Sequence, residues 1–232
     1  IYQWDASNQS WVDKGLGTIT LEPFMGCAIT QAYMPSYEWT TTPTNQNHKV
    51  SLLKGYNIFA NSYLAPLNVA AFKETDFEEE NVGDIHRTFY IFNTGSWSSW
   101  NKAATTDNNN HAITTTQSEG QYTAIPVASA RNLDQTTDPT TIAPMQGIYV
   151  YSTAPGAIKL DYETHVWNMA NPGTKAMRAP EKTVSPDLLR RIRIQAYGKN
   201  SGSDRLYILQ DMSCTPDYDN GYDGKNMNAK GQ

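Results

Sequence analysis

Short apolar or alternating segments, separated by turn residues, recur along the chain. Such segments predict strands, because successive side chains of a strand point to opposite faces. The sequence predicts strands at Thr18 to Leu21, Cys27 to Thr30, Phe89 to Phe92, Ile148 to Tyr151, Ala157 to Leu160, Arg191 to Ala196 and Arg205 to Leu209. Helical periodicity is nearly absent, with short turns at 69–74 and 185–189 as the best candidates. We therefore expect an all-β fold, a β-sandwich or jelly-roll-like assembly with minimal helix.

Two sequence patterns occur twice in the same order. The first is a pair of aromatic residues at alternate positions, then Asp or Asn, then Trp. Its copies are Tyr2, Trp4, Asp5 and Trp11, and then Tyr90, Phe92, Asn93 and Trp97 or Trp100. The second is a Pro-x-x-Gly turn before a strand, at 23–26 and 144–147, where proline presets φ near −65° and the glycine is expected to accept a positive φ. The repetition predicts two related halves.

The second copy is longer than the first because it contains a segment rich in Asn and Thr. We predict a truncated first β unit at 1–53 and a second β unit at 54–232, with this insertion at 101–140. The polar part of the insertion, 101–120, is too poor in apolar residues to bury a core. It is expected to form a surface loop or a ragged hairpin.

The composition is typical of an exported β protein. Charged residues make up 18% of the chain and aromatic residues 11%. A net charge of −5 argues against a nucleic-acid partner, since phosphate binding needs a concentrated basic face. No run of eighteen apolar residues occurs, so no membrane span is predicted. The first residues resemble neither an initiator nor a signal peptide, and we expect a fragment of a longer protein. Cys27 and Cys214 could pair across the fold, or each could be a small buried hydrophobe.

Three segments resemble large secreted surface proteins of Bacteroidota. Residues 54–68, which include Gly55-Tyr56-Asn57 and Asn61-Ser62-Tyr63, resemble their GWN-hydrophobic-GNPY segment. Residues 142–150 resemble their I-x-P-x-Q-G-F-F-V strand, and 192–223 resemble their closing stretch. Ala60 and Ser62 replace the usual Gly and Pro of GNPY, and Cys27 replaces an expected aromatic residue. The resemblance implies an extracellular or cell-surface location and a β-rich module, more firmly than it implies a chemistry.

An acidic loop near the C-terminus is the candidate metal site. Asp217, Asp219 and Asp223 surround Gly221, and flexible oxygen-rich loops of this kind suit calcium. The spacing is not that of an EF-hand. The alternative is a network of Asx turns that only shapes the loop. A second acidic run, which includes residues 78–80, is expected to be a solvated loop.

No catalytic residue is predicted. The four histidines have no metal-ligand spacing, and the nucleophile-elbow and phosphate-loop motifs are missing. The candidate ligand-binding residues are Trp97, Trp100 and Tyr90, because aromatic rings beside small polar residues can stack on sugar rings. A repeated Trp can equally be a structural pillar.

We therefore expect a non-catalytic binding or adhesion module whose partner is a glycan or a surface protein. The alternatives are a structural spacer or assembly domain and, third, a fragment of a polysaccharide-active enzyme. Such an enzyme needs two carboxylates across a cleft, and the sequence selects no pair.

Overall fold

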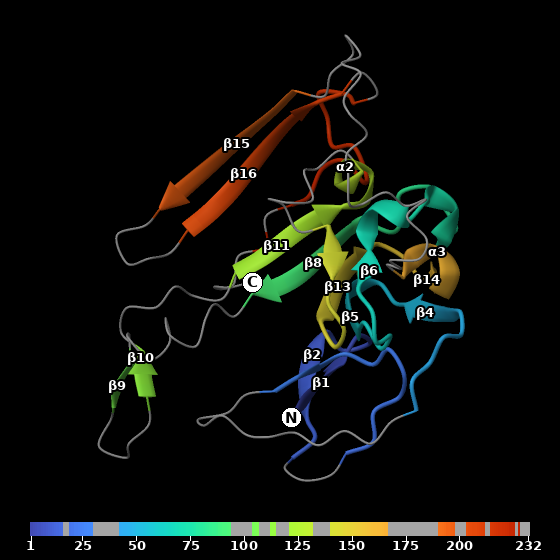
Figure 1. Ribbon diagram of the computed structural model, residues 1–232, viewed down its shortest axis with the longest axis vertical. Coiled ribbons are helices and arrows are strands. Elements are labelled where there is room, and N and C mark those ends of the chain that lie inside the picture. The colour runs from blue at the N-terminus through green and yellow to red at the C-terminus, as the bar shows by residue number, and fades with distance from the viewer. Residues whose placement is uncertain are drawn as a thin grey trace.

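The computed structural model describes the chain in segments. These are residues 1–15, 19–29, 42–93, 104–106, 112–114, 121–131, 140–166, 190–197, 203–211, 214–225 and 227. Strands dominate the described part, and every ladder between two named strands is antiparallel (Figure 1). The fold is all-β, as the alternation of the sequence predicts.

The strands form several sheets. The N-terminal sheet has the order β2-β1-β3, with β1 Tyr2–Asp5, β2 Ser10–Asp13 and β3 Cys27–Ala28. The four-stranded sheet has the order β11-β8-β13-β5, with β5 Gly55–Ala60, β8 Thr88–Asn93, β11 Gln121–Pro126 and β13 Gly147–Ser152. The three-stranded sheet has the order β4-β14-β7, with β4 His48–Leu52, β7 Phe77–Glu78 and β14 Gly156–Leu160.

Three strand pairs and four short helical turns complete the described structure. The pairs are β6 (Leu67–Asn68) with β12 (Thr141–Ile142), β9 (Ala104–Thr106) with β10 (Ala112–Thr114), and β15 (Arg190–Tyr197) with β16 (Ser203–Gln210). The helical turns are η1 (Val69–Ala71), η2 (Glu74–Asp76), α2 (Val127–Ala130) and α3 (Tyr162–His165). In Figure 1 the β15–β16 hairpin extends beside the four-stranded sheet instead of joining it.

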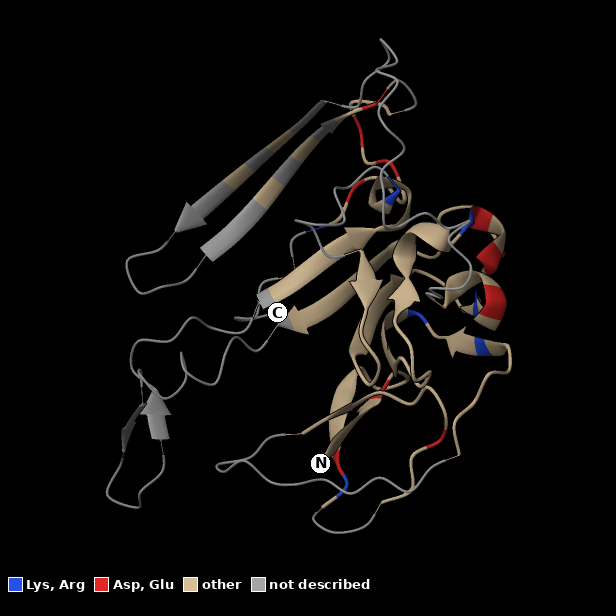
Figure 2. Cartoon of the chain, viewed as in Figure 1, with Lys and Arg blue, Asp and Glu red and all other residues tan. Residues whose placement is uncertain are grey.

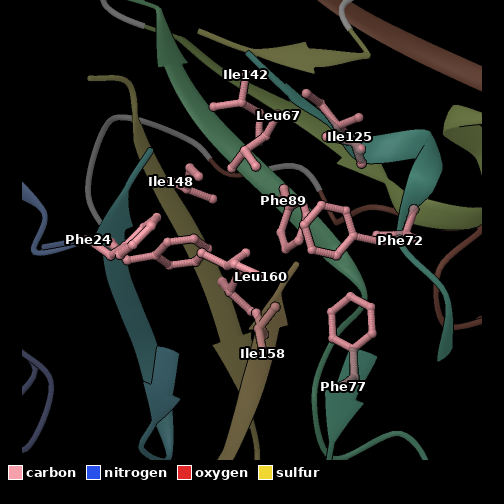
Figure 3. Close-up of a cluster of buried hydrophobic side chains, with 14 of the residues drawn as sticks. Phe24, Leu67, Phe72, Phe77, Phe89, Ile125, Ile142, Ile148, Ile158 and Leu160 are labelled. Atoms are coloured by element: carbon pink, nitrogen blue, oxygen red, sulfur yellow. The ribbon is translucent and has the colours of Figure 1, made fainter. Parts of the chain in front are cut away.

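One core lies between the four-stranded and the three-stranded sheets. Alternate residues of both sheets point into it and are almost fully buried, and residues of the β6–β12 pair and of the adjoining turns complete it. The members labelled in Figure 3 are Phe24, Leu67, Phe72, Phe77, Phe89, Ile125, Ile142, Ile148, Ile158 and Leu160. Phe72, just after η1, stands edge-on to Phe89 with ring centroids 5.0 Å apart. The helical turns therefore close one side of the sandwich with aromatic rings.

Two adjacent corners connect the layers. Strands β4 and β5 follow each other closely in sequence but belong to different sheets, and the same is true of β13 and β14. The Asn57 amide holds the first corner: its Oδ1 accepts from the Leu53 N–H at 2.8 Å, and its Nδ2 donates to the Leu53 carbonyl at 2.8 Å. At the second corner, the Ser152 hydroxyl donates to the Ala154 carbonyl at 2.6 Å. Buried side chains thus satisfy backbone groups where the chain changes sheet.

The two Pro-x-x-Gly turns have the same conformation, but the positive φ is not at the glycine. Phe24 has φ 63° and Met145 has φ 64°, each at the position after proline. The prediction that the glycines adopt positive φ is wrong, because these are type II turns in which the residue after proline takes that conformation. Gly26 is required for space instead, since a Cβ there would lie 2.7 Å from Ile58 Cγ2.

Both turns contact the C-terminal end of β5, the first at Ala60 and the second at Asn61 just after the strand. The Phe24 carbonyl accepts from the Ala60 N–H at 3.0 Å, and the Gln146 carbonyl accepts from the Asn61 N–H at 3.1 Å. The boundary predicted between residues 53 and 54 does not separate two cores. Phe24 and Leu52 precede it, yet they belong to the same buried cluster as the residues after it. The ladder between β4 and β14 also crosses it.

Most predicted strands are confirmed. They correspond to β3, β8, β13, β14, β15 and β16, whereas the described residues 19–21 of the first predicted strand are not in a strand. The helical turn predicted at 69–74 is confirmed as η1 followed by η2, and 185–189 lies outside the described residues. Within 101–120 the structure describes only the short β9–β10 pair, which agrees with the predicted ragged hairpin.

Candidate functional site

The outer face of the four-stranded sheet is rich in aromatic residues. Its inner face forms the core, and about half of the positions that alternate with the core residues carry aromatic side chains. These residues, called the aromatic face below, are Tyr56 of β5, Tyr90 and Phe92 of β8, Tyr122 of β11, and Tyr149 and Tyr151 of β13. The strand register makes them cross-strand neighbours. Tyr151 lies opposite Tyr56, Phe92 opposite Tyr122, and Tyr90 opposite Tyr149.

The rings of the aromatic face hold one another in place. The ring centroids of Tyr56 and Tyr151 are 5.0 Å apart and those of Tyr122 and Tyr149 5.1 Å, both edge-on. The Phe92 ring is 5.0 Å from that of Tyr122. These separations are those of favourable aromatic pairs. All the rings except that of Tyr90 remain partly exposed, so the face offers an ordered and accessible aromatic surface.

The four strands that carry this surface contain no charged side chain. None of the strands β5, β8, β11 and β13 contains Asp, Glu, Lys, Arg or His, and in Figure 2 they show neither blue nor red. Burial raises the pKa of Tyr90 to about 12, and burial also raises the pKa of Tyr56 and Tyr149, with neighbouring tyrosines adding to the effect. These hydroxyl groups are therefore protonated at neutral pH and can both donate and accept hydrogen bonds.

His86 and Tyr218 border one end of the aromatic face. The His86 ring centroid lies 4.9 Å from that of Tyr151 and 5.5 Å from that of Tyr218. Burial lowers the pKa of His86, and the charge of Lys225 lowers it further. The His86 ring is therefore neutral at neutral pH. The charge at this end of the face is that of Lys225, whose Nζ lies 5.4 Å from the Tyr218 ring centroid.

The N-terminal hairpin covers the free edge of the sheet next to Tyr56. The Gln9 side-chain amide pairs with the Tyr56 backbone: Oε1 accepts from its N–H at 2.7 Å, and Nε2 donates to its carbonyl at 3.0 Å. The Trp4 indole also donates to this carbonyl, at 2.7 Å. Gly55 (φ 104°) leaves room for Gln9, because a Cβ there would lie 2.4 Å from Gln9 Cδ. These contacts satisfy backbone groups that an open edge strand would expose.

Of the three predicted ligand-binding residues, the structure describes Tyr90. Trp97 and Trp100 lie outside the described residues. Tyr90 lies in the middle of the aromatic face, but it is only 2% exposed, so its ring supports its neighbours rather than offering a surface to a ligand. Sequence reasoning missed the exposed aromatic residues around it. The signal was present as alternating tyrosines in 147–152 and as an aromatic residue at alternate positions of the segments that pair with it.

Two of the three carboxylates predicted to bind calcium accept hydrogen bonds within the loop of residues 215–224. Both oxygens of Asp219 accept from Thr215: Oδ2 from its N–H at 2.6 Å and Oδ1 from its hydroxyl at 3.1 Å. Asp223 Oδ2 accepts from the Asp219 N–H at 2.8 Å, and Asp217 is exposed. This is the Asx-turn arrangement considered as the alternative. Among the described residues, no group of three or more His, Cys, Asp or Glu side chains could hold a metal ion.

The same loop docks on the four-stranded sheet through its neutral residues. Asn220 Oδ1 accepts from the Arg87 N–H at 2.7 Å, and its Nδ2 donates to the Ile85 carbonyl at 2.8 Å. The Gly221 carbonyl accepts from the Ala128 N–H at 2.8 Å. The loop therefore supplies partners to backbone groups just before β8 and at the N-terminal end of the turn α2.

The acidic run at 78–80 is partly buried and paired, so the expectation of a solvated loop is wrong for its central residue. The side chain of Glu79 is 5% exposed and bonds Arg87 Nη2 at 2.8 Å, while its other oxygen accepts from the Ile85 N–H at 2.9 Å. Glu78 forms ion pairs with Lys49 and Lys159. Burial of Glu79 is possible because both of its oxygens have partners.

His165 and Asp76 form a second buried polar pair. The Asp161 N–H donates to His165 Nδ1 at 2.9 Å, so Nε2 carries the proton and donates to Asp76 Oδ2 at 3.2 Å. The ring is 1% exposed and stacks on Phe72 with centroids 3.9 Å apart. Both ring nitrogens are occupied by structural partners, which leaves neither free to accept a proton from a substrate.

No helix in the described part of the chain is long and apolar enough to cross a membrane. Comparison with protein-family models, with curated proteins and with solved structures finds no match to this chain.

Proposed function

We propose that the chain is a non-catalytic binding module of an extracellular or cell-surface protein and that the aromatic face binds a neutral glycan. The observation that carries this proposal is the combination of partly exposed, mutually supported aromatic rings with an uncharged sheet. Sugar rings present apolar C–H groups on one side and hydroxyl groups at their edges. An aromatic surface with tyrosine hydroxyls complements both.

The proposal also accounts for the neutrality of the surface. An acidic or basic polymer would gain from oppositely charged side chains, and the four strands contain none. A neutral oligosaccharide loses nothing by their absence. The ordered rings lose little conformational freedom on binding, since their neighbours already restrict them.

The experiment is isothermal titration of the protein with neutral oligosaccharides of glucose, mannose and xylose, with polygalacturonate as the acidic comparison. We expect binding to one neutral series, and we expect Tyr151→Ala and Tyr122→Ala each to weaken it by roughly tenfold. Trp11→Ala is the control, because Trp11 is 40% exposed on β2 and lies outside the aromatic face. Thermal melts of each variant distinguish loss of binding from loss of folding.

Two results would overturn the proposal. One is binding that survives both tyrosine substitutions. The other is the absence of binding to any neutral series by the folded protein, which would favour the spacer or assembly role.

A further inference from the structure

Two described segments lie on the outer face of the four-stranded sheet, at opposite corners. At the first corner Gly26, just before β3, packs on Ile58 of β5, because a Cβ at Gly26 would lie 2.7 Å from Ile58 Cγ2. Ile58 points to the same side of β5 as Tyr56, since the two are separated by one residue. The N-terminal segment therefore covers β5 beyond Tyr56.

At the opposite corner, the loop of residues 215–224 lies on β11 and β8. A Cβ at Gly224 would lie 2.9 Å from Ala124 Cβ on the outer side of β11. A backbone hydrogen bond from Lys225, the next residue, reaches the Tyr90 hydroxyl of β8. This cover explains why the Tyr90 ring, in the middle of the aromatic face, is only 2% exposed.

The rings that stay partly exposed form a diagonal between the two covered corners. In order, this diagonal consists of Tyr56, Tyr151, Tyr149, Tyr122 and Phe92, called the aromatic strip below. Tyr151 and Tyr149 lie on the same side of β13. Ring contacts join Tyr56 to Tyr151 at one end, and Tyr149, Tyr122 and Phe92 at the other. The strip therefore connects the two edge strands of the sheet.

The aromatic strip is much longer than one sugar ring. Tyr56 and Tyr122 lie on the two edge strands, three strand spacings apart, which corresponds to about 14 Å. Along the strands, the two ends of the strip lie two residues to either side of the level at which Tyr149 pairs with Tyr90, which corresponds to about 13 Å. The ends are therefore roughly 20 Å apart. A pyranose ring is about the size of one tyrosine ring, so a single sugar reaches only one end.

We propose that the aromatic strip binds several consecutive units of one extended, linear, neutral glycan, and not a single terminal sugar. This inference rests on the proposed function of the aromatic face. An extended β-linked chain, such as that of cellulose, follows a nearly straight path and brings successive units onto rings of one surface. A helically wound α-linked chain, such as that of amylose, curves away from a single sheet after few contacts.

The packing of the rings supports a gain in affinity with chain length. Neighbouring rings already restrict one another, so each further unit of the glycan adds a stacking contact without ordering a new side chain. The gain should end when the chain spans the strip. The two covered corners favour the diagonal path, because the loop and the N-terminal segment stand on either side of it.

Isothermal titration of the full chain with oligosaccharides of increasing length tests the proposal. The probes are the β-linked oligosaccharides of glucose, mannose and xylose, from the single sugar to the hexasaccharide. The α-linked glucose oligosaccharides of the same lengths are the wound comparison. We expect the hexasaccharide of one β-linked series to bind at least about a hundredfold more tightly than its single sugar. The α-linked series is expected to show no such gain.

Substitutions at the two ends of the strip distinguish one long site from one small site. Tyr56→Ala and Tyr122→Ala are each expected to weaken hexasaccharide binding about tenfold, because each removes one ring of the strip. A disaccharide reaches only one end, so only one of the two substitutions should weaken its binding. Leu64→Ala is the control, since Leu64 is 65% exposed and lies outside the four-stranded sheet. Thermal melts verify that each variant is folded.

The possible failures of this inference and of the proposed function differ. A single sugar that binds as tightly as the hexasaccharide, or a preference for the α-linked series, would overturn the inference and leave glycan binding by the aromatic face in place. Equal weakening of disaccharide binding by both end substitutions would overturn it in the same way. Absence of binding to every neutral series would overturn both.

Discussion

Strands β13 and β15 have similar alternation of apolar residues, yet they lie in opposite environments. Ile148 and Val150 of β13 are fully buried, whereas Ile192 and Ile194 of β15 are about half exposed. The difference is the second layer: β13 faces the three-stranded sheet across the core, whereas the β15–β16 hairpin forms a two-stranded sheet of its own and its residues belong to no buried cluster of the described part of the chain. Alternation thus defines a face, but stability and function depend on what covers that face.

The largest expected effect comes from removing a core ring of the sandwich. Phe89→Ala should lower the free energy of unfolding by about 3–5 kcal/mol, since it leaves a cavity among Phe59, Phe72 and Phe77. Ile192→Ala in the hairpin should change it by no more than about 0.5 kcal/mol in dilute solution. Urea unfolding measures both. Equal losses would mean that the hairpin belongs to the same cooperative unit as the core.

The second-largest effect is expected from removing the buried side-chain amide of Asn61. Asn61 is fully buried, and its Nδ2 donates to the carbonyls of Ala65 and Ile142. Asn61→Ala should destabilise the protein by about 1–3 kcal/mol, because it leaves buried carbonyls without a donor. Asn45→Ala, at an exposed position, is the control and should have almost no effect. Equal losses of unfolding free energy for the two substitutions, measured by urea unfolding, would contradict this expectation.

A smaller effect is expected from pH. Burial lowers the pKa of His165 in the folded protein below its ordinary 6.5, so folding favours the neutral ring. The contribution of His165 to the free energy of unfolding is complete above pH 6.5. It is lost as the pH falls from 6.5 toward the pKa that His165 has in the folded protein, at no more than about 1.4 kcal/mol per pH unit. His165→Gln should flatten the decline in stability between about pH 6.5 and 5. Burial also lowers the pKa of His48 and His86, so the free energy of unfolding of the His165→Gln variant should still decline with falling pH, but less steeply.

The smallest effect is expected at the loop of residues 215–224, which docks on the body without joining its core. Because Asp219 and Asp223 already accept hydrogen bonds from the loop, millimolar calcium or a chelator should shift the melting temperature by less than about 1 °C. Asp219→Asn, which keeps the size of the side chain, is the control for the loop. A clear calcium-dependent rise that this substitution removes would show that the predicted calcium site is real.

The sequence predicts the strands better than it predicts their partners. The segments of β8, β13, β14, β15 and β16 are visible as alternation, because period two is a local property. The single core is not visible, since the pairing of β4 with β14 joins residues about a hundred positions apart. The boundary that the sequence predicts between residues 53 and 54 therefore divides residues that belong to one hydrophobic core.

The candidate site illustrates the same limit. Tyr90 is singled out by a repeated pattern, yet it is only 2% exposed, and its cross-strand partner Tyr149 comes from a strand far along the sequence. The motif residues Asn57, Asn61 and Tyr63, which carry the resemblance to surface proteins, all bond backbone groups at corners of the sandwich. These motif residues therefore indicate the fold. The aromatic face cannot be seen in any one segment, because it is formed by residues of four separate strands.

The most direct test of the glycan-binding proposal is a two-dimensional NMR titration of the labelled protein with the neutral oligosaccharide that binds in calorimetry. The account predicts that the shifted signals come from β5, β8, β11 and β13, centred on Tyr122, Tyr149 and Tyr151, while those of the β15–β16 hairpin stay in place. Shifts confined to the hairpin, or to residues away from the four-stranded sheet, would contradict it.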